Sequence, residues 1–195
     1  MPDFMMPADP AKIDVPVGGE VRLLLGDQLD RGHAWLQTVD TDVTYLLAET
    51  GGELSYVRHH RQKAAAFLGA MRVFAGELQH AGHRVLYYRL DNPDNQQDLA
   101  RQLVKTARQH GASRVAWLEP DEWRVDQTIR TAVTATDLPW QVQSTAHFYT
   151  ERDHLGEFFK GKKRWLLESF YRDMRRRHDL LMEGDKPAGE ALSLI

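Results

Sequence analysis

The sequence predicts an α/β fold: a Rossmann-like, doubly wound sheet of about five parallel strands, followed by a C-terminal helical extension. Five short apolar runs follow one another along the first 145 residues, and most are separated by segments with apolar residues at helical spacing. Beyond this region only helical patterns occur. Strands that alternate with helices favour a parallel sheet covered on both faces, because right-handed crossovers lay helices over it.

Each predicted strand is a short run of apolar, β-branched or aromatic residues. The fourth run ends at Pro120, which has no amide hydrogen to donate to a sheet, and the fifth run is the weakest. The five runs are 21–26, 42–49, 83–90, 113–120 and 140–144.

The predicted helices lie mainly between the later strands. The longest begins near Tyr56 and ends at Gly82, where a glycine suits a left-handed helix end. A second covers 95–110 and is closed by Gly111, and a third follows Asp121. The segment 30–39 has room only for a short helix or a loop.

The composition is ordinary for one soluble globular domain of 195 residues. We divide the chain into a flexible leader (1–20), an α/β domain (21–150) and a helical extension (151–195), which has two helices with a break at Gly161 and no further strand. No apolar run reaches the ~18 residues of a membrane span, and the start is not a secretory signal. The absence of cysteine excludes disulfides and thiolate chemistry in this chain and fits a cytoplasmic protein.

The formal net charge is -3, so there is no global basic field. Two local segments, "KGKKRW" (160–165) and "RDMRRRHD" (172–179), are candidates for contact with a nucleic-acid backbone. The alternative is a solvated helix face, and Glu168 and Asp173 dilute the charge. We therefore expect DNA contact by this chain to be weak or absent.

Ligands of an open parallel sheet bind beyond the carboxyl ends of its strands. Gly26, Asp27 and Gln28 follow the first predicted strand, and Glu49 ends the second. The glycine-rich fingerprint of a dinucleotide site is absent, and the carboxylate of Asp27 would repel a phosphate. A neutral polyol or a heterocycle with N–H groups suits these side chains better.

Two alternatives remain open for these residues. Gly-Asp after a strand is a common turn, in which Asp27 or Asp30 caps the following segment. Alternatively, Asp27, Glu49 and Glu119 hold a magnesium ion in a small ligand-binding enzyme on the same fold.

The segment "YVRHHRQK" (56–63) does not predict a metal site, because adjacent histidines on a helix point about 100° apart. His60 shares a helical stripe with Ala64 and Phe67, which predicts a buried, hydrogen-bonded histidine. Lys63 faces either the pocket or solvent.

Several segments together resemble the amino-terminal part of the bacterial photolyase-related proteins, the cryptochromes and (6-4) photolyases that carry an iron–sulfur cluster. The resemblance extends from about Val21 to Gly189. The segments are "LLLGDQL", "YVRHHRQK", "AMRVFAGEL", "RVLYYRLDNPDN", "EPDEWRV", "FFKGKKRWLLESFYRDMRRRHDLLM" and "GDKPAG".

The resemblance implies that a Rossmann-like domain binds an antenna chromophore, 6,7-dimethyl-8-ribityllumazine. Gly26, Asp27 and Gln28 match the family's first strand-end loop, Glu49 matches the second, and Tyr56 and His60 match the start of a helix. In the family, FAD, damaged DNA and the iron–sulfur cluster are bound by a larger helical domain that follows. Here "GDKPAG" is followed by "EALSLI", so we expect those sites to lie outside this chain.

The expected function is therefore that of an antenna domain of a light-driven DNA repair protein or photoreceptor, which is not catalytic without the FAD domain. In another class of function, the chain is an interaction module that forms a homodimer or pairs with a companion helical domain.

Overall fold

The structure is a computed structural model that describes residues 6–52, 60–145 and 147–188. The chain divides into two compact units, Met1–Thr145 and Ala146–Ile195.

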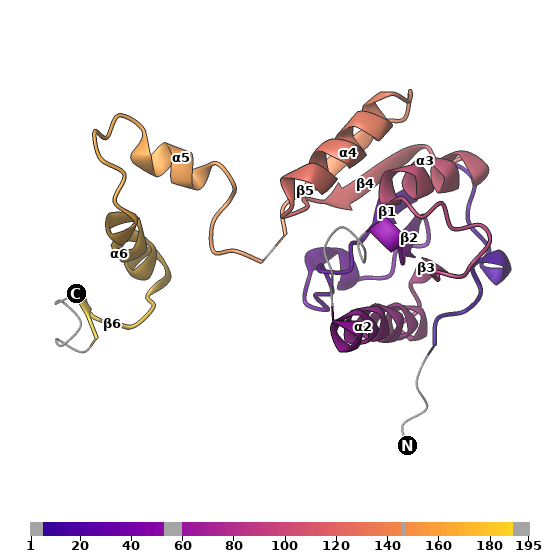
Figure 1. The fold of residues 1–195 in the computed structure, drawn as a ribbon, viewed down its shortest axis with the longest axis horizontal. Helices are drawn as coiled ribbons and strands as arrows, with labels where there is room; N and C mark the ends of the chain where they lie inside the picture. The colour runs from indigo at the N-terminus through magenta and orange to yellow at the C-terminus, as the bar shows by residue number, and fades with distance from the viewer. Residues whose placement is uncertain (1–5, 53–59, 146, 189–195) are drawn as a thin grey trace, which may run out of the picture. The chain divides into compact units, whose positions relative to one another are not determined.

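Five parallel strands form the sheet of the first unit, in the order β3-β2-β1-β4-β5 (Figure 1). The order reverses between β1 and β4, so the predicted doubly wound fold is confirmed. Leu23 of β1 lies opposite Leu46 of β2 and opposite Trp117 of β4. The strands are β1 (Glu20–Leu23), β2 (Val43–Ala48), β3 (Arg84–Tyr88), β4 (Arg114–Leu118) and β5 (Trp140–Gln143).

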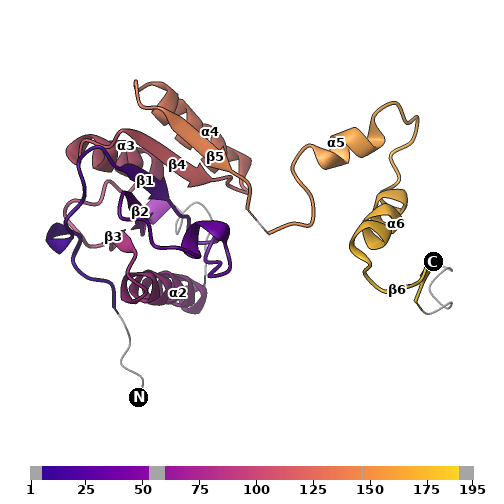
Figure 2. The same cartoon turned by 180° about the vertical axis from the view of Figure 1, so that it is seen from behind.

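Helices cover both faces of this sheet (Figures 1 and 2). One face packs against α2 (Arg61–His80), and the other against α3 (Leu99–Gln109) and α4 (Trp123–Thr134). Successive strand residues point to opposite faces, so Leu46 belongs to the core under α3 and α4 whereas Leu47 belongs to the core under α2.

The helix ends follow from local hydrogen bonds. The side chain of His60 accepts a hydrogen bond from the Gln62 amide and caps α2, which therefore begins at Arg61. The side chain of Asp98 accepts a hydrogen bond from the Arg101 amide and caps α3. The helix therefore begins at Leu99, whereas the predicted segment begins at residue 95. Gly82 and Gly111 follow α2 and α3 with positive φ angles of 94° and 60°, as their predicted closing role requires.

The described part of the predicted leader packs within the first unit. Pro10–Lys12 form a short 3₁₀ helix, and Ile13 and Val15 pack against the core under α3 and α4. The Gly18 amide donates a hydrogen bond to the carbonyl oxygen of Gly111. A second 3₁₀ helix, Ala34–Leu36, is the short helix allowed for in 30–39.

The second unit contains α5 (His154–Phe159) and α6 (Leu167–His178), with Gly161 at φ 76° between them. The two predicted helices and their break are confirmed. The expectation of no further strand is wrong, because β6 (Met182–Glu183) pairs with β7 (Lys186–Pro187). Strands of two residues are too short to show an alternating pattern. In the described ranges, no helix has the length and apolar character to cross a membrane.

Candidate functional site

A cavity of about 200 Å³ lies beyond the carboxyl ends of β1, β2 and β4, where the strand order reverses. The strand-end segments supply most of its polar residues, and α2 supplies Lys63 and a large part of the apolar wall. The lining consists of Leu25, Gly26, Asp27, Ala48, Glu49, Thr50, Lys63, Ala64, Phe67, Leu68, Met71, Leu99, Pro120, Glu122 and Val125.

Gly26 is required by a close approach between the first strand-end loop and α2. A Cβ atom at this position would lie 2.4 Å from Cζ of Phe67 and 2.8 Å from Sδ of Met71. The missing side chain therefore lets two residues of the cavity wall pack directly against the loop backbone.

Asp27 and Gln28 differ in what their side chains do. Asp27 is exposed and lines the cavity. Gln28 is 2% exposed and does not line it. Its amide oxygen accepts from the Leu25 amide at 3.1 Å, and its amide nitrogen donates to the carbonyl oxygens of Leu118 and Glu119 at 3.2 and 3.3 Å. Gln28 thus joins the end of β1 to the end of β4.

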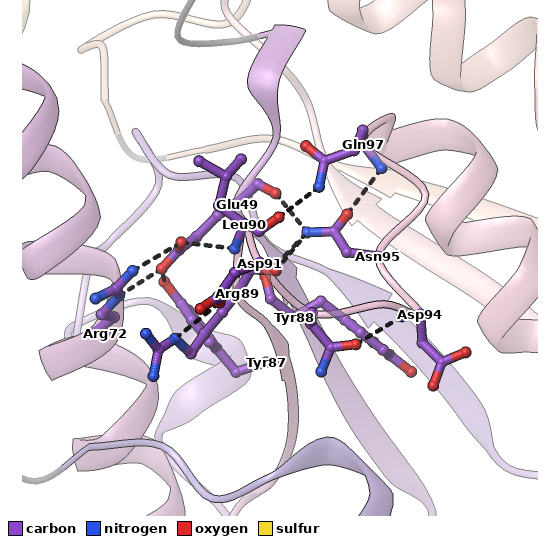
Figure 3. A network of polar contacts seen from close by, with 11 residues as sticks. Glu49, Arg72, Tyr87, Tyr88, Arg89, Leu90, Asp91, Asp94, Asn95 and Gln97 are labelled. Atoms are coloured by element: carbon purple, nitrogen blue, oxygen red, sulfur yellow. Dashed lines mark hydrogen bonds and ion pairs between the residues drawn. The ribbon is translucent and has the colours of Figure 1, made fainter.

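Glu49 is the centre of a buried polar network (Figure 3). Arg72 of α2 forms a bidentate pair with it, with Nε 2.6 Å from Oε1 and Nη2 2.9 Å from Oε2. The Tyr87 hydroxyl donates to Oε1 at 2.7 Å, and the Leu90 amide donates to Oε2 at 2.9 Å. Each oxygen of the carboxylate therefore already accepts two hydrogen bonds from the protein.

These contacts determine the protonation of the network. Burial would raise the pKa of Glu49, but the hydrogen bonds from Arg72, the Leu90 amide and Tyr87 lower it below its ordinary value of 4.5. The hydrogen bond to Glu49 raises the pKa of Arg72, and burial raises the pKa of Tyr87. At neutral pH, Glu49 is ionised and Tyr87 is a neutral hydrogen-bond donor.

A Glu49→Gln variant is expected to be less stable than the wild type at neutral pH, and the difference is expected to shrink in acid. Because folding lowers the pKa of Glu49, its contribution is complete above the unfolded value, near 4.5, and is lost as the pH falls through the folded value. Urea unfolding followed by circular dichroism from about pH 7 to about pH 3 measures this. A stability difference that grows towards low pH would contradict the assignment.

A second set of hydrogen bonds ties the loop after β3 to the loop after β2 (Figure 3). The Asn95 side-chain amide donates to the carbonyl oxygens of Glu49 and Arg89 at 2.6 and 2.9 Å. Gln97 accepts from the Gly51 amide and donates to the carbonyl oxygen of Leu90. Hydrogen bonds to backbone atoms therefore hold these two loops together at the edge of the cavity.

The model of the deoxyribodipyrimidine photo-lyase-related protein family matches residues 22–194. The chain belongs to this family. It is also similar to a (6-4) photolyase of Agrobacterium fabrum, with 37% identity over 168 residues. The matched region covers 86% of this chain and 33% of that protein, so the chain spans about a third of the length of this curated relative.

The sequence also predicts roles for His60, Tyr56 and Lys63. The expectation that His60 is buried is wrong, because it is the exposed residue that precedes α2, and it does not line the cavity. Tyr56 lies outside the described residues. Lys63 faces the cavity. Among the described residues no three His, Asp or Glu side chains are grouped to hold a metal ion, and the Glu49 carboxylate suggested for magnesium is bound to Arg72.

Sequence reasoning missed the partners of Glu49 and the apolar wall as parts of one site. Arg72 and Tyr87 lie in segments whose patterns predict only a helix and a strand. The sequence carries a signal for these partners, because a carboxylate predicted at a buried strand end needs a cation or several hydrogen-bond donors within reach. Phe67 and Met71 pack in or against the core under α2, and they are also part of the cavity wall.

Proposed function

We propose that the cavity binds 6,7-dimethyl-8-ribityllumazine and that the first unit is the antenna domain of a light-driven, photolyase-related protein. The observation that carries this proposal is the position of a largely apolar cavity at the strand-order reversal, without a glycine-rich phosphate loop. The family supports it, since the chain belongs to the photo-lyase-related proteins.

The cavity wall suits a planar heterocycle. Phe67, Leu68 and Met71 on α2 lie across from Leu99 and Val125, so apolar side chains come from helices on both faces of the sheet. Flat rings gain affinity mainly from such contacts, and a few polar groups fix their orientation. Polar atoms at the cavity come from Asp27, Thr50, Lys63 and Glu122.

A ribityl chain has a place beside the ring. A smaller hollow of about 80 Å³ shares Thr50, Leu99 and Val125 with the cavity, so the two are adjacent. Its lining includes Gln97 and Thr128, whose side chains carry hydrogen-bonding groups suited to hydroxyls. The main cavity of about 200 Å³ would hold the ring, and the hollow would hold the neutral polyol.

The bound lumazine would absorb light and pass the energy to a flavin. The chain's own residues would exclude water from the ring and hold it in one orientation, and no acid, base or nucleophile of this chain is required. FAD, the iron–sulfur cluster and any DNA-repair activity are proposed to belong to the part of such a protein that these residues do not cover. This chain alone would then not be an enzyme.

An Ala64→Trp variant is expected to abolish lumazine binding, because Ala64 lines the cavity and an indole there fills it. Ala65→Trp is the matched control, since Ala65 is exposed on the same helix and does not line the cavity. Binding is measured by the absorption and fluorescence of added 6,7-dimethyl-8-ribityllumazine with the purified chain. Equal binding by both variants, or no binding by the wild type, would refute the proposed site.

A second candidate function is pairing with another copy of the chain or with a companion helical domain. Large apolar side chains of the second unit are exposed, including Phe148 at 67%, Leu167 at 72% and Leu181 at 68%. Such exposed groups are typical of protein contact surfaces. Sedimentation that gives a monomer at every concentration would exclude the homodimer.

A further inference from the structure

The two basic segments of the second unit differ in how much of their charge is already used. In α6, Arg172 pairs with Glu168 at 2.5 Å and Arg177 pairs with Asp173 at 2.6 Å. Arg175 is 8% exposed and donates to the carbonyl oxygens of Leu180 and Leu181 beyond the helix end. Most of the charge in "RDMRRRHD" therefore stabilises α6 itself.

The loop between α5 and α6, residues 160–166, keeps its charge exposed. Lys160, Lys163 and Arg164 are exposed, and among the described residues no carboxylate pairs with them. Lys162 lies against the ring of Phe158, with Nζ 3.2 Å from the ring centroid. No acidic residue occurs between Phe159 and Leu167. The loop is thus strongly cationic in a chain of net charge -3.

Trp165 stands at the end of this cationic loop and is 75% exposed. Its ring stacks on Phe159, with centroids 5.8 Å apart and an angle of 22° between the planes. Phe159 is 3% exposed and contacts Phe158 and Phe170, so the stack rests on the aromatic core of the second unit. The indole is therefore backed on one side while most of its surface is accessible.

We propose that the loop 160–166 binds single-stranded nucleic acid, with Trp165 as the platform for one base and Lys160, Lys163 and Arg164 as contacts for the phosphates. Proteins that bind single strands combine a cationic track with aromatic rings on which bases stack. Both parts occur here within six residues of sequence, 160–165. This departs from the weak or absent DNA contact expected from the sequence, and it is independent of the lumazine proposal.

An apolar protein partner is the alternative occupant. It would cover Trp165 and the neighbouring Leu166 and Leu167, which are 58% and 72% exposed. It would leave unexplained the three cations Lys160, Lys163 and Arg164 of the same loop, which pair with no carboxylate among the described residues, since desolvating unpaired charges is costly. The charge of the loop therefore favours a polyanion.

The stacking role is tested with the full chain and a fluorescently labelled oligothymidine of about 12 nucleotides, by fluorescence anisotropy. Trp165→Ala is expected to weaken binding about 5- to 150-fold. Trp123→Ala is the matched control, because Trp123 is 73% exposed in the first unit and is expected to leave the affinity unchanged. Oligouridine and a DNA duplex in parallel distinguish DNA from RNA and single strands from double strands.

The phosphate role is tested by the salt dependence of the same binding. Lys163→Ala with Arg164→Ala is expected to reduce the slope of log affinity against log salt by about 1.4, since each single-strand phosphate contact contributes about 0.7. Arg101→Ala with Arg108→Ala removes the same charge from α3 as a control. The proposal is overturned if the wild type does not bind the single strand, or if each test variant binds like its control while circular dichroism remains that of the wild type.

Discussion

Replacing Glu49 by alanine is expected to lower the free energy of unfolding by about 3–5 kcal/mol, the cost of breaking a buried ion pair by removing one partner. The Glu49 side chain is inaccessible to solvent, and its loss leaves Arg72, the Tyr87 hydroxyl and the Leu90 amide without their acceptor. Urea unfolding at neutral pH, followed by circular dichroism, measures the change.

Glu77→Ala is the matched control for this prediction. Glu77 also pairs with an arginine of the chain, Arg31, at 2.6 Å, but the two side chains are 39% and 67% exposed. A surface ion pair contributes only about 0–1 kcal/mol, because water and side-chain entropy offset the attraction. An equal loss of unfolding free energy in the two variants would show that the buried Glu49 network stabilises the fold no more than a surface ion pair does.

Gly26→Ala is expected to destabilise the first unit by about 1–3 kcal/mol, the usual cost of overpacking. The added methyl group would overlap Cζ of Phe67 and Sδ of Met71, so the cavity wall would have to move. Because both residues line the cavity, the same variant is expected to weaken lumazine binding.

Gly69→Ala provides a control of opposite sign on α2. No atom lies within 4 Å of a Cβ built at Gly69, and its place inside a helix means that alanine should stabilise by about 0.5–1 kcal/mol. Thermal and urea unfolding of both variants measure the pair. A stabilising effect at Gly26 would contradict the close approach that the structure places there.

The fold could be predicted because its signals are local and repeated. Most of the strands lie in short apolar runs of the sequence, and Gly82 and Gly111 mark helix ends by a requirement of the backbone alone. The position of the cavity also followed from a general rule, that ligands of a doubly wound sheet lie beyond the strand ends. The same rule predicts Gly26, Asp27 and Glu49 at this edge from the sequence alone.

The roles of the polar side chains could not be predicted, because they depend on contacts between distant segments. Glu49 meets Arg72 and Tyr87 only after β2, β3 and α2 have packed together, and Gln28 meets the carbonyl oxygens of β4 some 90 residues further on. The prediction that His60 is buried is wrong for a local reason. The apolar stripe includes His60 in the helix, whereas the helix begins one residue later and leaves His60 exposed as its cap.

The side chains of Gln28, Glu49 and Asn95 have a consequence for how such a site can change. They bind protein groups, and so they form a frame whose hydrogen bonds do not involve a ligand. The wall residues Ala64 and Leu68 both lie on α2. Substitutions at Ala64 and Leu68 would therefore change the shape of the cavity wall without removing any of these hydrogen bonds.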